Sequence, residues 1–150
     1  MASDDGLTQV WGQLASLFTT KREEFFDIIR RQGLTPPHGF ALVSILEGPV
    51  RMRDMADHMN CDASYITAIV DRLETTGLAV RQSDASDRRV KVIALTAKGR
   101  RVATELRTTL SAPPPAFEEL SPADRKALAR ILAKIVPADA GSPFRPRVQR

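Results

Sequence analysis

Cysteine and histidine are nearly absent from this 150-residue chain. It contains one cysteine, Cys61, and two histidines, His38 and His58. A single thiol cannot form an internal disulfide, and three such side chains fall short of the ligand sets that hold zinc. We therefore expect no metal site, and the unpaired cysteine favours a reducing compartment, the cytoplasm.

Long hydrophobic runs are also missing. The longest apolar stretch, residues 40–46, is too short to span a bilayer, and the acidic N-terminus lacks the apolar segment of an export signal. We expect no membrane association. The sequence has no glycine-rich phosphate loop and no spacing that suggests a nucleophile, a base and an orienting group. We therefore expect neither an enzyme nor a bound cofactor.

Aromatic residues are scarce, at 5%, whereas aliphatic and charged residues are abundant. A hydrophobic content of 43% is enough for one well-buried unit in a chain of this length, and the 27% charged content suits a helical protein. We expect a single domain over residues 1–137 that is mainly α with a small β component.

The positive charge is concentrated in the middle of the chain. The net charge is +4, and residues 30–107 account for that value with thirteen basic and nine acidic side chains, whereas residues 1–29 sum to −3. Lysine and arginine displace the counterions of nucleic acids, so this pattern favours phosphate contact. An ordinary solvated surface is the alternative.

Hydrophobic spacing predicts helices at both ends of the chain, over about residues 5–32, 97–112 and 121–136. Thr96 and Ser121 are suited to cap the second and third of these. The three helices carry apolar stripes outside the central region, so we expect them to pack against a second copy in a twofold homodimer. A self-contained monomeric core is the alternative. Residues 138–150 lack periodicity and are predicted to form a flexible basic tail.

The centre, about residues 35–96, has the pattern of a winged helix-turn-helix. A helix opens at Thr35-Pro36, a second covers residues 52–59, and the turn Asn60-Cys61-Asp62 leads into a third over residues 63–76. The segments 78–82 and 90–95 are predicted to form a β-hairpin whose loop, residues 83–89, is the wing.

One face of the helix over residues 63–76 is predicted to contact DNA. Burial of its apolar stripe leaves hydroxyls for phosphates or base edges, a small side chain for a thymine methyl and a cation for guanine or phosphate. These candidates are Ser64, Tyr65, Thr67, Ala68 and Arg72. Asp71 would repel phosphate unless it pairs with Arg72 or a cytosine amine. A solvated helix face is the alternative.

The wing carries two arginines. Asp87 and Arg89 are two residues apart, so in an extended segment their side chains project from one face and the carboxylate can orient the guanidinium. We expect Arg88 and Arg89 to reach the narrow, negative minor groove. A surface ion pair without a partner molecule is the alternative.

These motifs resemble those of the MarR family of bacterial transcription regulators. The resemblance rests on the order of the elements, the Met55-Ala56 helix, the run Val70–Leu78 and the signature Asp87-x-Arg89-x5-Leu95-Thr96. It covers roughly residues 7–136. It implies an obligate homodimer with interleaved terminal helices that binds a palindromic operator, often as a repressor.

The resemblance also implies release from DNA by a small aromatic or phenolic ligand bound between the dimerisation helices and the DNA-binding lobe. The aromatic candidates for such a pocket are Trp11, Phe18, His38 and Phe40. Aromatic residues at helical spacing more often belong to a core or a dimer interface.

Two alternatives to this function stay open. Some members of the family sense oxidants through a cysteine in the first helix, but the only thiol here, Cys61, lies in the turn before the recognition helix. A redox-responsive regulator using Cys61 is one alternative. The other is a winged-helix module that binds protein without specific DNA binding, which predicts weak, salt-insensitive behaviour toward duplex DNA.

Overall fold

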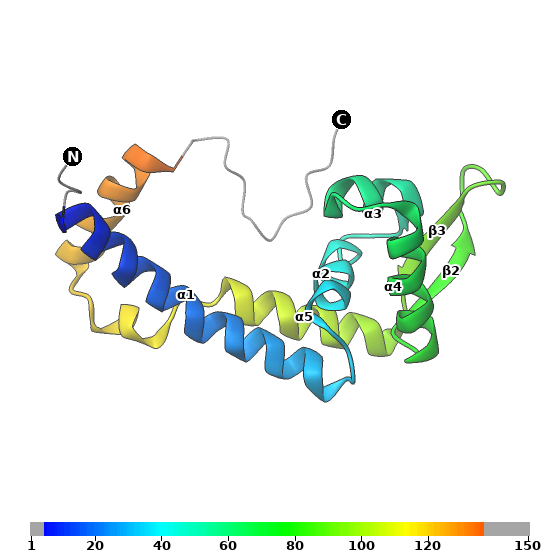
Figure 1. Ribbon diagram of the computed structural model, residues 1–150, viewed down its shortest axis with the longest axis horizontal. Helices are drawn as coiled ribbons and strands as arrows, with labels where there is room; N and C mark the ends of the chain where they lie inside the picture. The colour runs from blue at the N-terminus through cyan, green and yellow to red at the C-terminus, as the bar shows by residue number, and fades with distance from the viewer. Residues whose placement is uncertain (1–4, 137–150) are drawn as a thin grey trace.

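The computed structural model describes residues 5–136, so the expected basic tail lies outside the described residues. The described chain is elongated (Figure 1). A compact lobe, residues 35–96, lies at one end, and two helical arms, the first half of the N-terminal helix and residues 115–136, lie at the other. Its elements in chain order are α1 (Asp5–Arg31), α2 (Pro36–Ser44), β1 (Val50–Arg51), α3 (Met52–Met59), α4 (Ala63–Thr75), β2 (Ala79–Ser83), β3 (Lys91–Leu95), α5 (Ala97–Ser111), the 3-10 helix η1 (Pro115–Glu119) and α6 (Pro122–Ile135).

The predicted helix starts are confirmed by their capping bonds. Asp62 Oδ1 accepts from the Tyr65 N–H (2.8 Å), Thr96 Oγ1 from the Gly99 N–H (2.9 Å), and Ser121 Oγ from the Asp124 N–H (3.2 Å). Each bond satisfies a backbone donor that the first helical turn leaves without a partner. The borders of α4, α5 and α6 therefore follow from the local sequence.

The sheet contains one strand more than the predicted hairpin. β2 and β3 pair antiparallel from Ala79↔Leu95 to Ser83↔Lys91, as expected, and β1 pairs with the other edge of β3 through Val50↔Ile93. Two residues are too few to show an alternating pattern, so β1 could not be predicted from hydrophobic spacing. The added strand fixes the start of α3 against the wing hairpin.

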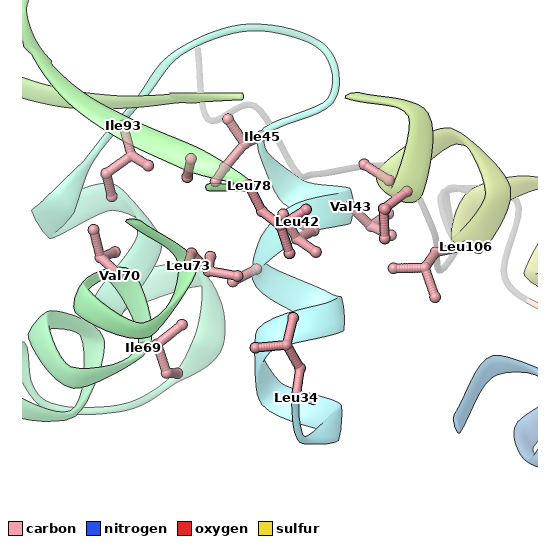
Figure 2. Close-up of a cluster of buried hydrophobic side chains, with 14 of the residues drawn as sticks. Leu34, Leu42, Val43, Ile45, Ile69, Val70, Leu73, Leu78, Ile93 and Leu106 are labelled. Carbon is pink, nitrogen blue, oxygen red and sulfur yellow. The ribbon is translucent and has the colours of Figure 1, made fainter. Parts of the chain in front are cut away.

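The core lies where the lobe meets α5 and the second half of α1. Apolar side chains from α2, α4, β2 and β3 converge there with Leu106 of α5 (Figure 2). The largest fully buried side chains include Phe25, Ile29, Leu42, Ile66, Leu73, Leu78 and Leu106.

At Gly99, α5 packs closely against the backbone of Leu78, which lies between α4 and β2. A Cβ on Gly99 would lie 1.7 Å from the Leu78 carbonyl oxygen, so only glycine fits there. Thr96 adds a hydrogen bond from its hydroxyl to the Gly77 carbonyl (2.7 Å), and Gly77 takes the left-handed φ of +70° that ends α4. The orientation of α4 is thereby tied to the helix that leads into the arms.

The first half of α1 and the whole of α6 leave most of their apolar side chains exposed. No residue of α6 is buried. Apolar side chains of α1 and α6 are at least half exposed, namely Leu7, Val10, Trp11, Phe18, Ile131 and Ile135. In the part of the chain that the structure describes, no helix combines the length and apolar content needed to cross a membrane.

Candidate nucleic-acid interface

α4 presents a polar ridge to solvent. Its apolar residues Ile66, Ile69, Val70 and Leu73 are buried, as their spacing predicts. The opposite face is exposed and carries Ser64, Tyr65, Thr67, Ala68 and Asp71. Because residues three and four apart lie on one side of a helix, Ser64, Thr67, Ala68 and Asp71 form one line, which we call the ridge.

The hydroxyl protons of the ridge are already engaged. Ser64 Oγ donates to Asp62 Oδ1, and Thr67 Oγ1 donates to the Ala63 carbonyl (2.8 Å). The hydroxyl oxygens retain lone pairs, so in this arrangement they accept hydrogen bonds, for example from the amino groups of adenine or cytosine. The Ser64 hydroxyl, followed by the Tyr65 N–H, lowers the pKa of Asp62, which keeps this cap ionised.

Arg72 lies at the edge of the exposed face and reaches toward the α1–α2 turn. Its Nη2 donates to the Gly33 carbonyl at 3.0 Å. The guanidinium therefore connects the recognition helix to the end of α1, and contact with guanine or phosphate would use its other N–H donors. The guanidinium of Arg72 is thus directed toward Gly33 and not along the ridge.

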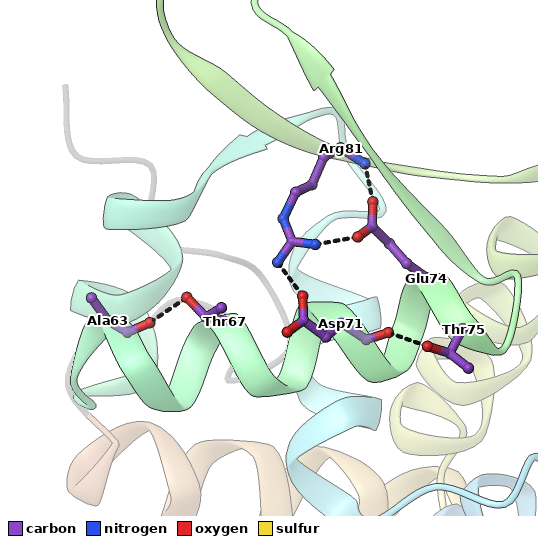
Figure 3. Close-up of polar contacts among 6 residues, drawn as sticks. All are labelled: Ala63, Thr67, Asp71, Glu74, Thr75 and Arg81. Carbon is purple, nitrogen blue, oxygen red and sulfur yellow. Dashed lines mark hydrogen bonds and ion pairs between the residues drawn. The ribbon is translucent and has the colours of Figure 1, made fainter.

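Asp71 is paired, although not with the residue that the sequence suggested. Its carboxylate accepts from Nη2 of Arg81 at 2.6 Å, across from β2 (Figure 3). Arg81 also contacts Glu74 of α4 through Nη1 and through its backbone N–H (2.7 Å). Sequence reasoning missed Arg81 because a partner ten residues away, beyond a helix end and a turn, leaves no periodic signal.

The wing loop is organised by Asp84, a second residue that sequence reasoning did not single out. Its Oδ1 accepts from the backbone N–H groups of Ser86 (2.7 Å) and Asp87 (3.3 Å), and also from the Ser86 hydroxyl. The Ser86 contacts lower the pKa of Asp84. A carboxylate that bonds the backbone two residues on is typical of an Asx turn, the signal that the sequence did contain.

Asp87 orients Arg89 through the backbone. Its Oδ1 accepts from the Arg89 N–H at 3.0 Å. Among the ion pairs of residues 5–136, none joins the Asp87 carboxylate to the Arg89 guanidinium, which differs from the contact expected for an extended segment. The reason is that the loop turns at this point. Arg88 and Arg89 are both exposed at the wing tip.

The four aromatic ligand candidates lie in two separate places. Trp11 and Phe18 are each 70% exposed on the first half of α1. Phe40 packs on Phe25, with ring centroids 5.0 Å apart. Because a helix rises 1.5 Å per residue, Trp11 is about 21 Å along α1 from Phe25. A single protomer does not bring the four side chains into one pocket.

His38 stands at the start of α2. Its Nδ1 accepts from the Thr35 backbone N–H at 3.3 Å. Burial lowers the pKa of His38 from its ordinary value, and this outweighs a hydrogen bond with Thr35 that acts in the opposite direction; the Arg72 cation adds to the lowering. The neutral imidazole is therefore favoured at the joint between lobe and arm.

A charged groove of about 730 Å³ runs between α1 and α5. It is lined by Glu24, Asp27, Ile28, Arg30, Arg31, Glu105 and Thr109, none of them a sequence candidate. Ion pairs already join Arg31 to Glu105 and Arg30 to Asp27 across this surface. Within the described residues, no group of three or more His, Cys, Asp or Glu side chains could hold a metal ion.

Cys61 is half-buried in the turn before α4. Burial raises the pKa of its thiol, and the Asp62 carboxylate adds to the increase. Because the thiolate is the species that oxidants attack, this environment disfavours redox sensing.

Comparison with known proteins points in the same direction as the motifs. A model of the MarR family matches residues 34–91. The HTH-type transcriptional repressor MdtR of Bacillus subtilis (strain 168) is 30% identical over 99 residues, which are 65% of this chain. The match spans 64% of the length of that repressor.

Solved structures extend the likeness to nearly the whole chain. YusO from Bacillus subtilis is 27% identical with a TM-score of 0.73, over 92% of this chain and 99% of that one. CouR from Rhodococcus jostii RHA1, bound to p-coumaroyl-CoA, is 29% identical with a TM-score of 0.61, over 89% and 95%. The winged helix-turn-helix predicted from the sequence is thus confirmed as the fold, and the similarity to a transcriptional repressor agrees with the expectation of a non-enzyme.

Proposed function

Because the chain belongs to the MarR family, we propose that it is a sequence-specific DNA-binding transcription regulator, a homodimeric repressor that a ligand releases from a palindromic operator. The observation that carries this proposal is the exposed ridge of α4 beside a wing tip bearing Arg88 and Arg89. The side chains that read the major groove are Ser64, Tyr65, Thr67 and Ala68, and the two arginines enter the adjacent minor groove. Arg72 donates one hydrogen bond to Gly33, and its other N–H donors contact DNA.

The arms support the dimer. Residues 5–32, 97–112 and 121–136 form the dimerisation region, and residues 35–96 form the DNA-binding lobe. Among the described residues 5–136, apolar side chains of α1 and α6 stay at least half exposed, and a second copy would bury them. A twofold dimer places two recognition helices about 34 to 36 Å apart, one helical turn of DNA.

The ligand is an aromatic or phenolic molecule. CouR binds p-coumaroyl-CoA, a phenolic thioester, which supports this class. Trp11 is about 21 Å along α1 from Phe25, on which Phe40 packs, so a site that uses both Trp11 and Phe40 forms between two chains. The ligand acts by binding one spacing of the two lobes more tightly than the other.

The proposal is tested by selecting bound fragments of the host genome with the purified protein and then titrating the recovered duplex at several salt concentrations. We expect a palindrome with half-sites about 10 base pairs apart, and an affinity that falls steeply as salt rises, because lysine and arginine displace counterions. Binding that is weak and insensitive to salt would favour the protein-binding alternative. Equal binding to every duplex would contradict sequence-specific regulation.

A parallel titration after peroxide treatment tests the redox alternative. Since burial raises the pKa of Cys61, we expect unchanged operator affinity and no oxidised thiol by mass spectrometry. Loss of affinity together with oxidation at Cys61 would favour a redox-responsive regulator instead.

A further inference from the structure

Arg81 connects the wing to the recognition helix through three contacts. Its backbone N–H and Nη1 are held by the two carboxylate oxygens of Glu74, and its Nη2 reaches Asp71. Figure 3 shows the side chain extending from the strand across α4 to both carboxylates. Glu74 thus anchors Arg81, and the anchored guanidinium is directed at Asp71.

The carboxylate of Asp71 is electrostatically unfavourable on a surface that binds DNA. The Asp71 side chain is 59% exposed and lies one helical turn from Thr67 on the ridge. A bare carboxylate there would face the phosphates and the negative potential of the groove. The Arg81 side chain is itself only 29% exposed, and its guanidinium is directed to the acidic pair.

The electrostatics of the cluster agree with the geometry. Burial would by itself lower the pKa of Arg81, but the contacts with Asp71 and Glu74 outweigh it and raise the pKa. The cation is therefore permanent. Exposed ion pairs add little to folding stability, so the main consequence of this one concerns what the ridge presents to a ligand.

We propose that Arg81 is a positioning residue for DNA recognition that acts through Asp71: held by Glu74, it neutralises the carboxylate on the ridge and so allows α4 to approach the phosphates. This inference rests on the proposed function. It assigns Arg81 no direct contact with DNA, which distinguishes it from Arg88 and Arg89 at the wing tip.

The test is a charge rescue, measured with the operator duplex recovered in the selection above. Arg81→Gln should weaken operator binding about tenfold or more, as for the loss of one good contact. Adding Asp71→Asn to Arg81→Gln should restore most of that loss. Asp71→Asn alone should leave affinity within about threefold of the original, because it removes the charge that Arg81 neutralises. A merely structural role would give no rescue, since Asp71→Asn cannot restore the bonds to Glu74.

Arg30→Gln is the matched control. It also removes one positive charge and breaks an exposed pair with an aspartate, but on α1, away from the ridge. Its operator affinity should stay within about twofold, because Arg30 is paired with Asp27 on α1, and no ion pair within the described residues joins it to Arg81, Asp71 or Glu74. An equal loss in Arg30→Gln would assign the effect to net charge and overturn the inference.

The remaining outcomes separate the inference from the function on which it rests. An unmodified protein that binds no operator contradicts the proposed function. Normal binding with Arg81→Gln unaffected, or with a double variant as weak as Arg81→Gln, overturns the role of Arg81 alone. Should Arg81→Gln unfold, Arg81→Lys replaces it, with a smaller loss that Asp71→Asn again removes; no recovery there would equally overturn the inference.

Discussion

The lobe and the arms of this molecule follow opposite rules of burial. In the lobe, Leu42, Ile66 and Leu73 are 0% exposed and are surrounded by other apolar side chains. In the arms, Trp11 is 70% exposed and Ile135 is 65% exposed, although their spacing is as regular as that in the lobe. Both regions are amphipathic, and only one of them covers its apolar face.

This difference separates two sources of stability. The lobe buries its apolar stripes against neighbours in the same chain, so it carries its own folding free energy. The arms expose theirs, so their order depends on a second surface. A regulator built this way can change the relative position of two lobes without unfolding either one. The predictions below test that separation.

The largest effect is expected in the core of the lobe. Leu73→Ala removes a fully buried side chain of α4 and should lower the free energy of unfolding by about 2 to 5 kcal/mol, because it adds a cavity to the lost burial. Denaturant unfolding measures the change. Ile131→Ala in α6 is the control, measured at a protein concentration where the chains are dissociated. Its side chain is 52% exposed, so in the single protomer it should cost less than 1 kcal/mol by the roughly 25 cal/mol per Å² of buried area. Equal losses would contradict the separation.

The next effect concerns the arms. Trp11→Ser should weaken self-association by about 1 to 3 kcal/mol, because buried aromatic residues dominate interfaces, while the lobe stays folded. Sedimentation over a concentration series measures it. Tyr65→Ser removes an aromatic side chain from α4 that is 46% exposed. It should leave the oligomeric state unchanged. If the unmodified protein is a monomer, or if Trp11→Ser leaves self-association unchanged, the apolar side chains of the arms are covered in some other way.

The same contrast explains what the sequence could predict. The bounds of α4 follow from contacts within a few residues, where Asp62 caps the start and Gly77 follows the end. The hairpin follows from alternation and from the polar loop between its strands. Caps and hydrophobic periodicity depend on residues close together in the chain, so they can be recognised from the sequence alone.

Contacts that join distant segments had no such signal. β1 is visible only through its pairing with β3, and Arg81 is recognised as the partner of Asp71 only when β2 is laid beside α4. The exposed face of α4 predicts Arg72 as a DNA contact, but its bond to Gly33 depends on where the α1–α2 turn lies. The candidate site was thus predictable as a set of elements, and its electrostatic pairing was not.

An effect of similar size, confined to DNA binding, is expected at the wing. Arg89→Ala should weaken operator binding by about 1 to 3 kcal/mol, as for one good groove contact, with the dimer intact. Fluorescence anisotropy with the operator duplex measures it. Arg130→Ala in α6 removes the same charge from an exposed position in the arms and should have little effect. Equal affinities for the two variants would exclude a role of the wing tip in DNA contact.

The smallest effect is expected at His38, where the lobe meets the arm. Because burial lowers its pKa in the folded state, the unfolded chain takes up this proton first as the pH falls. The stability that the neutral imidazole contributes is therefore present above its ordinary pKa near 6.5 and is lost as the pH falls through the lower folded value. Melting temperatures at pH 7.5 and 5.5 measure it: the unmodified protein should lose about 1 to 2 °C more than His38→Gln, since a partly exposed imidazole is well screened. His58→Gln, at an exposed position on α3, should behave like the unmodified protein. If His38→Gln loses as much as the unmodified chain, protonation of His38 does not affect the joint, and the two regions are coupled there through other contacts such as the bond from Arg72 to Gly33.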